Sequence, residues 1–424
     1  MFFVFFVKQQ NNIEICVIWN YNDLIIKQNP KLLKGVLIMV VKTPPMGWNS
    51  WNTFGPDINE EIVLKSIDTM VDTGLLDAGY DYIVIDDCWS LKERVDGKLV
   101  ADPEKFPHGM KFVADYAHSK GLKFGMYSCA AHLTCASYPG SYDYEFVDAA
   151  TFAEWGVDFL KYDYCFHPLS TEGHYLYKRM GLALANCGRD ILFSACNWGV
   201  ENVEEWIKTT GAHMWRSTVD INDTWESVKN LAMKQFPLQK YNGQGCFNDI
   251  DMLIVGMNGA GNVARDVEEN GLCGYTEYKT HFSFWAMMNS PLMIGCDITK
   301  MDDNAKAILT NKDVIAINQD PAQRQPFEMY QRVHEKGKDV AKELCTIAKY
   351  LDNGDIAIGM FNFTDSKCRN YIDTDVLGLP ITCGKTLELT ELWTGEKIKI
   401  KDGIYKTLLE AHDCKIYRAK VVDI

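Results

Sequence analysis

Residues 157–165 carry the sequence VDFLKYDYC, an apolar run of strand length that ends in Lys161 and Asp163. Similar runs recur along the chain, separated by segments with apolar residues at three- and four-residue steps. The runs lie at residues 44–52, 80–89, 122–129, 157–165, 190–198, 213–221, 246–252 and 291–298. Strands that alternate with helices form parallel sheets, and eight such units close a (β/α)8 TIM barrel. We expect this barrel over residues 39–324. An open doubly wound sheet is the alternative, but no G-x-G-x-x-G follows the first run.

The chain changes character from about residue 325 onward. Strand-like alternation of apolar and polar residues replaces the helical spacing. Two dipeptides in this part, Asn353-Gly354 and Thr394-Gly395, are signals for turns between antiparallel strands. We therefore expect a C-terminal antiparallel β-sandwich domain over residues 325–424.

The amino-terminal segment, residues 1–38, differs from both domains. It begins MFFVFFVKQQNN, an apolar start without a basic region before it or a small-residue cleavage site after it, which makes a poor secretory signal. The rest lacks a clear apolar period. We expect an N-terminal extension of unclear role that adds little to the fold, and a divergent export signal is the alternative.

The composition excludes several classes of partner. The formal net charge of −14 argues against nucleic acid or an anionic membrane, and no uninterrupted apolar run is long enough to span a bilayer. The 14 cysteines are scattered, without the C-x-x-C spacing of a zinc site. We expect a cytoplasmic protein with reduced thiols, with secretion as the alternative. The sequence leaves the oligomeric state open, and a homo-oligomer is compatible with it.

Nearly every predicted strand ends in a polar or aromatic side chain, at the end where a TIM barrel places its reactive groups. These residues are Trp48, Trp51, Asp86, Asp87, Tyr127, Lys161, Asp163, Asn197, Trp198, Arg216, Asp220, Asp249 and Asp251. Any one of them is most simply a helix cap or loop residue, but the whole series indicates one shared pocket. The chain has no histidine pair, no G-x-S-x-G and no Walker or dinucleotide loop, so we expect no metal and no cofactor. Carboxylates, aromatic rings and cations together suit a sugar, and two carboxylates can cleave a glycosidic bond.

Several sequence blocks resemble the signature of glycoside hydrolase family 27, which comprises α-galactosidases and α-N-acetylgalactosaminidases. They are PPMGWNSWNTFG, YIVIDDCW, TCASYPGSYDYEFVDAATFAEWGVDFLKYDYC, WRSTVDI, NDIDML and SPLMIGCDI, in the order of the family between residue 44 and about residue 300. The C-terminal β module is similar to the sandwich of the family. The resemblance implies an exo-α-galactosidase that removes terminal α-D-galactosyl residues from oligosaccharides or glycoconjugates.

The resemblance also implies a retaining mechanism. Asp163, in KYDYC, falls on the nucleophile of the family, and Asp220, in WRSTVD, falls on the general acid/base. Retention predicts that the two carboxyl groups lie about 5–5.5 Å apart. Lys161 and Arg216 are expected to keep Asp163 ionised, because nearby cations favour the charged form, and to bind ring hydroxyls.

The remaining substrate contacts follow from the same resemblance. Asp86 and Asp87 match the pair that binds the axial 4-hydroxyl and the 6-hydroxyl of galactose. Because this pair is intact, galactose is favoured over the β-L-arabinopyranosidase activity found in the family. The other matched positions are Trp51 and Tyr127 as walls, Trp198 as a further substrate contact, and Asp251 as a carboxylate at the rim.

Two positions depart from the pattern of the family, and a cysteine pair and a valine also bear on the prediction. Asn197 stands where a glutamate usually contacts the 2-hydroxyl, which leaves α-N-acetylgalactosaminidase as an alternative activity. Against that alternative, Val200 is larger than the residue that N-acetyl-specific members carry there. Cys129 replaces an acidic residue. Cys135 and Cys165 match a disulfide of secreted members, and in a cytoplasmic protein we expect this pair to be reduced. A non-catalytic sugar-binding barrel is the alternative of another class, but it needs no pair such as Asp163 and Asp220.

Overall fold

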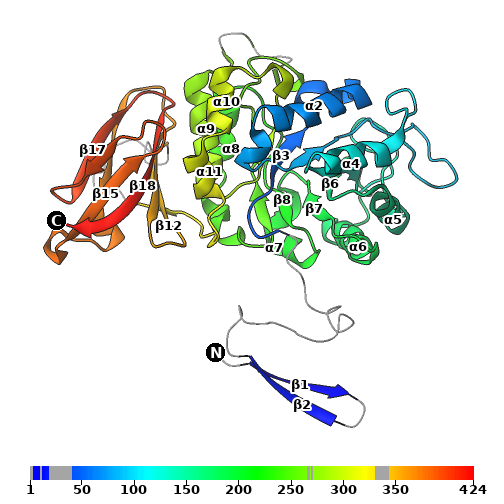
Figure 1. Cartoon of the computed structure of the whole chain (residues 1–424), viewed down its shortest axis with the longest axis horizontal. Coiled ribbons are helices and arrows are strands. Elements are labelled where there is room, and N and C mark those ends of the chain that lie inside the picture. Colours follow the sequence, from blue (N-terminus) through cyan, green and yellow to red (C-terminus); the bar gives the residue numbers. More distant parts are fainter. Residues whose placement is uncertain (1–2, 10–11, 19–40, 265–267, 269–270, 330–342) are drawn as a thin grey trace. The chain divides into compact units, whose positions relative to one another are not determined.

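The computed structural model describes residues 3–9, 12–18, 41–264, 268, 271–329 and 343–424 (Figure 1). Its internal contacts divide the chain into two units, Met1–Met39 and Val40–Ile424. In the first unit, β1 (Phe3–Gln9) pairs with β2 (Asn12–Ile18) as an antiparallel hairpin. The sequence did not predict this hairpin, and most of the extension at residues 1–38 lies outside the described residues.

Eight parallel strands form the sheet of the second unit, in the order β10-β3-β4-β5-β6-β7-β8-β9. Their bounds are β3 Met46–Asn49, β4 Tyr82–Val84, β5 Lys123–Cys129, β6 Phe159–Asp163, β7 Leu192–Ala195, β8 Met214–Arg216, β9 Phe247–Asp249 and β10 Leu292–Ile294. Leu253, which follows β9, bridges in parallel to Ile294, and its N–H donates to the Met293 carbonyl at 2.7 Å. The connection after β9 thus joins β10, at the other end of the strand order, and the sheet closes. The predicted (β/α)8 barrel is confirmed, and the open sheet is wrong.

Helices connect the strands and cover the outside of the barrel (Figure 1). Their bounds are α1 Trp51–Phe54, α2 Glu60–Asp72, α3 Leu75–Ala78, α4 Gly109–Ser119, α5 Glu145–Trp155, α6 Gly173–Asn186, α7 Val203–Trp206, α8 Trp225–Met233, α9 Tyr275–Met287, α10 Asp303–Leu309 and α11 Lys312–Asn318. Helix α2 illustrates how the local sequence starts a helix and buries one of its faces. The Asn59 side chain caps it by accepting from Ile62 N–H, and Val63, Ile67 and Met70 bury one face. Among the described helices, none has the length and apolarity needed to cross a bilayer.

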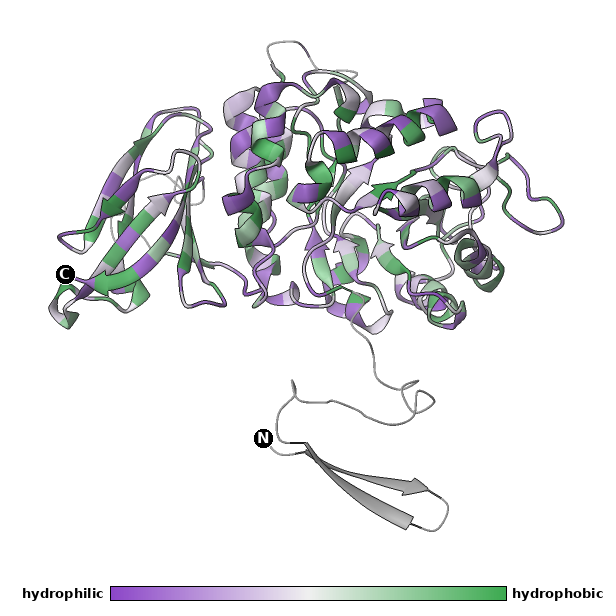
Figure 2. Ribbon diagram, viewed as in Figure 1, coloured by the Kyte–Doolittle hydropathy of each residue, from purple (hydrophilic) through white to green (hydrophobic). Residues whose placement is uncertain are grey.

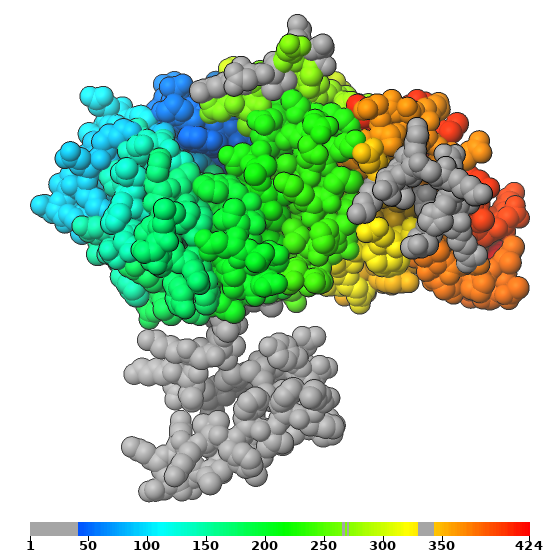
Figure 3. All heavy atoms as spheres, turned by 180° about the vertical axis from the view of Figure 1, so that it is seen from behind, coloured from blue at the N-terminus to red at the C-terminus, as the bar shows by residue number. Residues whose placement is uncertain are grey.

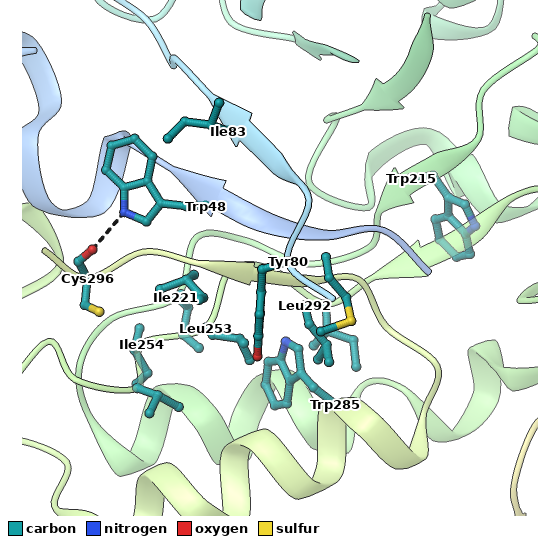
Figure 4. Packing of buried hydrophobic residues seen from close by; sticks show 14 of the residues in the cluster. Trp48, Tyr80, Ile83, Trp215, Ile221, Leu253, Ile254, Trp285, Leu292 and Cys296 are labelled. Atoms are coloured by element: carbon teal, nitrogen blue, oxygen red, sulfur yellow. Dashed lines mark hydrogen bonds between the residues drawn. The ribbon is translucent and has the colours of Figure 1, made fainter. Parts of the chain in front are cut away.

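The core lies in two layers. Inside the barrel, mainly strand residues pack together, among them Tyr82, Val84 and Phe159. Between the sheet and the helices lies a larger cluster that includes Trp48 and Trp285 (Figure 4). The Trp48 indole N–H donates to the Cys296 carbonyl at 2.9 Å, so this buried polar group is satisfied. This packing holds the strands rigid and fixes where their ends point.

The C-terminal part forms an antiparallel β domain. Its strands are β11 Phe327–Glu328, β12 Leu344–Tyr350, β13 Ile356–Asn362, β14 Cys368–Asp373, β15 Lys385–Glu391, β16 Lys397–Lys399, β17 Ile404–Leu409 and β18 Cys414–Asp423. They form a six-stranded sheet, β11-β12-β13-β18-β15-β16, and a pair, β14-β17. Figure 2 shows hydrophobic and hydrophilic residues alternating along these strands. The two predicted turns are confirmed, because Gly354 and Gly395 have positive φ angles of 86° and 75° between paired strands.

The β domain packs against α9 of the barrel. The Phe284 ring lies 5.3 Å from that of Phe361 and 5.5 Å from that of Phe363. The Trp393 indole N–H donates to the Ser283 hydroxyl at 3.1 Å. In the space-filling view of Figure 3, the green and yellow residues of the barrel lie directly against the orange residues of this domain. One apolar cluster includes residues of both domains.

Candidate active site

A cavity of about 250 Å³ lies where the barrel strands end. The residues from the sequence analysis that line it are Trp51, Asp86, Asp87, Tyr127, Cys135, Lys161, Asp163, Cys165, Trp198, Arg216, Asp220 and Asp251. They come from segments that are far apart in sequence, and the parallel strands bring them to one edge. The structure therefore gathers into one pocket most of the side chains that the sequence proposed for it. Trp48, Asn197 and Asp249 do not line this cavity, and Trp48 packs in the apolar core instead.

Asp163 is the last residue of β6 and is only 5% exposed. One carboxylate oxygen accepts from the backbone N–H of Tyr164 at 2.9 Å, and the other accepts from the Tyr127 hydroxyl at 3.2 Å. Burial raises the pKa of Asp163 to about 6, although Lys161 and the Tyr164 N–H both act to lower it. Lys161 thus favours the ionised form, as the sequence analysis expected, but burial outweighs it and the pKa lies above its usual value.

Asp86 and Asp87 follow β4, and their carboxylates are held by several donors each. The Asn49 amide and the Lys161 ammonium both donate to Asp86 Oδ2 at 2.8 Å. Asp87 accepts from the Cys88 N–H at 2.7 Å and from Thr134 and the Ala136 N–H at 2.9 Å. Carboxylate oxygens have further lone pairs, so both groups can still accept from sugar hydroxyls. Their orientation is fixed before a ligand arrives.

Arg216, at the end of β8, joins two carboxylates. Its guanidinium lies 2.8 Å from Asp220 and 2.7 Å from Asp251. Asp251 Oδ2 also accepts from the Ile221 N–H at 2.7 Å, so it anchors the segment that carries Asp220. The Asp220 side chain is 73% exposed, whereas that of Asp251 is 4% exposed.

Asp251 was expected to be a carboxylate at the rim. The structure instead buries its side chain against Arg216, and this burial raises the pKa of the Asp251 carboxyl. Its backbone has a φ angle of 110°, which is rare for a residue other than glycine. Strained backbone of this kind is retained where the surrounding structure imposes it, and here the carboxylate is fixed by Arg216 and the Ile221 N–H.

Asn197 is the predicted contact that the structure does not place in the cavity. The side chain is fully buried, and its amide donates to the Val200 carbonyl at 2.9 Å. The next residue, Trp198, has a φ angle of 57°, and Gly199 has one of 80°. Two successive left-handed residues turn the chain sharply, so that Trp198 lines the cavity and Asn197 does not. Direct contact between Asn197 and the sugar 2-position is therefore not supported.

Sequence reasoning missed a second group of lining residues: Asn52, Ile221, Asn222, Met252, Asn262 and Val263. Four of them lie within two positions of a predicted residue, so proximity in sequence was a usable signal. Asn262 and Val263 lie in a short 3₁₀ helix, Asn262–Ala264, in the connection after β9. The Asn262 amide donates to the Trp51 carbonyl at 2.8 Å, a contact between residues 211 positions apart. No local sequence pattern predicts a contact between residues so far apart in the chain.

Cys135 and Cys165 are joined by a disulfide that lines the cavity beside Asp163. The resemblance matched this pair to a disulfide, and the structure forms that bond. A reduced pair was expected only for a cytoplasmic protein, and that location stays a prediction. Eleven other cysteines of the described residues are unpaired. One of them, Cys129, is buried, and its thiol donates to the Cys165 carbonyl at 3.2 Å.

One group in the described part of the chain has the side chains and the spacing to hold a metal ion. It consists of Cys135, Asp163 and Cys165, whose ligand atoms all lie within 4.8 Å of one another. While the disulfide is intact, the two sulfurs are bonded to each other and do not act as thiolate ligands.

Comparison with known proteins agrees with this fold. The family model for alpha galactosidase A matches residues 43–320, and that for the alpha galactosidase C-terminal beta sandwich domain matches residues 342–419. The alpha-galactosidase of Cyamopsis tetragonoloba is 40% identical over 380 residues, which cover 89% of this chain and 86% of that protein. The probable alpha-galactosidase of Dictyostelium discoideum is 39% identical, with 88% and 91% covered. The solved structure of α-galactosidase from Saccharomyces cerevisiae superimposes with a TM-score of 0.80 at 30% identity, with 90% and 98% covered.

Proposed function

The chain belongs to the α-galactosidase family, glycoside hydrolase family 27, and we propose that it removes terminal α-D-galactosyl residues from oligosaccharides or glycoconjugates with retention of configuration. One observation carries this proposal. A buried carboxylate, Asp163, and an exposed one, Asp220, line the same small cavity. A cavity of this size suits one terminal sugar ring, which favours exo action.

The mechanism assigns the two carboxylates different roles. Asp163 Oδ2 attacks the anomeric carbon while the Asp220 carboxyl protonates the leaving oxygen, and a covalent galactosyl-enzyme forms. Asp220, now a carboxylate, then takes a proton from water, which attacks the same carbon and releases Asp163. Arg216 holds Asp220 at 2.8 Å, and the Tyr127 hydroxyl at 3.2 Å orients Asp163. Lys161 supplies positive charge beside the nucleophile.

The sugar is held by fixed groups in this proposal. Asp86 and Asp87 accept hydrogen bonds from the 4- and 6-hydroxyls. Their carboxylates are already oriented for this by Asn49, Lys161 and Thr134. The argument for the alternative substrate, an α-N-acetylgalactosaminide, used the Asn197 amide as a hydrogen-bond partner for the acetamido group. Because that amide is buried and bonded to the Val200 carbonyl, the argument for this alternative lapses and galactose is preferred.

We propose a cytoplasmic location. Eleven unpaired cysteines in the described residues suit a reducing compartment better than an oxidising one. The Cys135–Cys165 disulfide then has to withstand, or respond to, cellular reductants.

Turnover of three nitrophenyl glycosides tests the function: the α-galactoside, the α-N-acetylgalactosaminide and the β-L-arabinopyranoside. We expect the highest kcat/KM for the α-galactoside. If either of the other two substrates is hydrolysed faster, its sugar is the preferred one and the assignment of galactose is wrong. Binding of galactose without turnover of any of the three would point to the non-catalytic sugar-binding barrel.

A further inference from the structure

The cluster of Cys135, Cys165 and Asp163 has a chemistry that sugar hydrolysis does not require. Two sulfurs and a carboxylate oxygen lie within 4.8 Å of one another around one point of the cavity wall. The Tyr127 hydroxyl lies 3.3 Å from Cys135 Sγ and 3.2 Å from Asp163 Oδ2, which ties two of the three groups together. A metal site needs such converging ligands and an entry path.

We propose that reduction of the Cys135–Cys165 disulfide creates a binding site for zinc or a similar thiophilic divalent ion, formed by both thiolates and the Asp163 carboxylate. Occupation of this site blocks the proposed hydrolytic activity, because the metal then holds the nucleophile. The metal-binding part stands on the cluster itself, and only the inhibition rests on the proposed function.

The redox step balances with a cellular dithiol as the reductant. The dithiol gives up two electrons and two protons, becomes a disulfide, and leaves Cys135 and Cys165 as two thiols. The metal ion then displaces both thiol protons to solvent, and the carboxylate of Asp163 joins as the third ligand. A water molecule completes four-coordination, as in other zinc sites with three protein ligands.

The ligand spacing fits this ion. Zinc–sulfur bonds of about 2.3 Å in a tetrahedron place two sulfurs about 3.8 Å apart and a sulfur and an oxygen about 3.5 Å apart. The three atoms already lie within 4.8 Å, so side-chain rotation alone brings them to the metal. Thiolates select zinc or copper(I) over magnesium and calcium, whose preferred ligands are oxygens.

Neighbouring groups favour this set of three. Cys129 is not part of it, because its buried thiol is directed at the Cys165 carbonyl. The Lys161 ammonium donates its hydrogen bond to Asp86 at 2.8 Å and not to Asp163, although its charge lies beside Asp163. Both cluster cysteines line the sugar cavity, so a reductant and an ion can enter as the substrate does.

The test compares oxidised and phosphine-reduced wild-type enzyme with and without stoichiometric zinc; a phosphine is used because dithiols bind zinc themselves. For the reduced enzyme we expect zinc to lower α-galactoside turnover by at least about tenfold, reversibly with a chelator, since zinc sites with thiolate ligands bind tightly. The oxidised enzyme is expected to keep its rate. Cobalt(II), added in place of zinc, is expected to give a thiolate charge-transfer band in the near ultraviolet only after reduction.

Two variants sharpen the comparison. The double variant Cys135→Ala, Cys165→Ala should show neither zinc sensitivity nor the cobalt band, with each rate compared to the same variant without metal. Cys383→Ser, which removes an exposed thiol elsewhere, should respond as the wild type does. Equal zinc sensitivity of the oxidised enzyme, or a reduced enzyme without the cobalt band, overturns the proposal. If no α-galactoside is hydrolysed at all, the proposed function fails while the cobalt band still decides the metal site.

Discussion

Replacing Lys161 with methionine should move the acid limb of the pH–rate profile upward. The pKa of Asp163 is about 6 in the structure, raised by burial and held back chiefly by the Lys161 charge. The variant loses this cation, and it also frees the Asp86 charge that Lys161 neutralises at 2.8 Å. Both changes disfavour the ionised nucleophile, so the pKa of Asp163 should rise by about 1–3 units.

The size of the effect follows from the ionised fraction of Asp163. At pH 6 about half of the wild-type nucleophile is ionised, whereas a rise of one unit leaves about a tenth in the variant. The measurement is kcat/KM for a nitrophenyl α-galactoside from pH 4 to pH 9, which reports the free enzyme. We expect the acid limb near pH 6 in the wild type and near pH 7 or above in Lys161→Met.

A surface lysine provides the matched control. Lys111 on α4 is 61% exposed and pairs with Asp115, so Lys111→Met should leave the acid limb in place. A uniform loss of kcat/KM at all pH values, with an unmoved limb, would show that Lys161 acts only by binding the sugar. A limb displaced to lower pH would refute the electrostatic reasoning itself.

Three further predictions concern other parts of the molecule. Asp220→Ala should retain activity on substrates with good leaving groups and, with added azide, should release α-galactosyl azide, because azide replaces water in the second inversion; release of the β-azide would contradict Asp220 as the acid/base. Burial lowers the pKa of Lys349 to about 7, below its unfolded value, so the wild type should gain up to about 1.4 kcal/mol of stability per pH unit between pH 7 and 10. Lys349→Met should lack this rise; if the free energy of unfolding of both proteins changes equally between pH 7 and 10, the prediction is wrong. Deletion of residues 1–38 should leave activity and Tm nearly unchanged, because the family match begins at residue 43; a fall of more than a few degrees would show that the segment supports the barrel.

The barrel could be predicted because each strand is buried on both faces. Such strands appear in sequence as short continuous apolar runs, as in Phe159–Asp163, and the helices between them show their own period. The closure could not be predicted in detail. It depends on the bridge between Leu253 and Ile294, where Leu253 lies outside a regular strand. The hairpin of β1 and β2 was missed because its apolar start was weighed as an export signal.

The site could be predicted to the extent that strand ends fix it. Asp163 and Arg216 occupy the last positions of β6 and β8, so their convergence follows from the topology. Asn197 was misplaced because the left-handed turn at Trp198 reverses which neighbour faces the cavity. The raised pKa of Asp163 depends on three-dimensional burial, which no local pattern reveals.

The central claim is that Asp163 forms a covalent bond to the sugar, and trapping that bond tests it most directly. A fluorinated α-galactosyl fluoride, which forms the intermediate faster than water releases it, is incubated with the enzyme. The protein is then reduced to open the Cys135–Cys165 disulfide, digested with trypsin and analysed by mass spectrometry. We predict one added sugar on the peptide 162–178, with fragmentation placing it on Asp163. A label on another carboxylate, such as Asp220, or complete turnover to β-galactose without any label, would contradict the account.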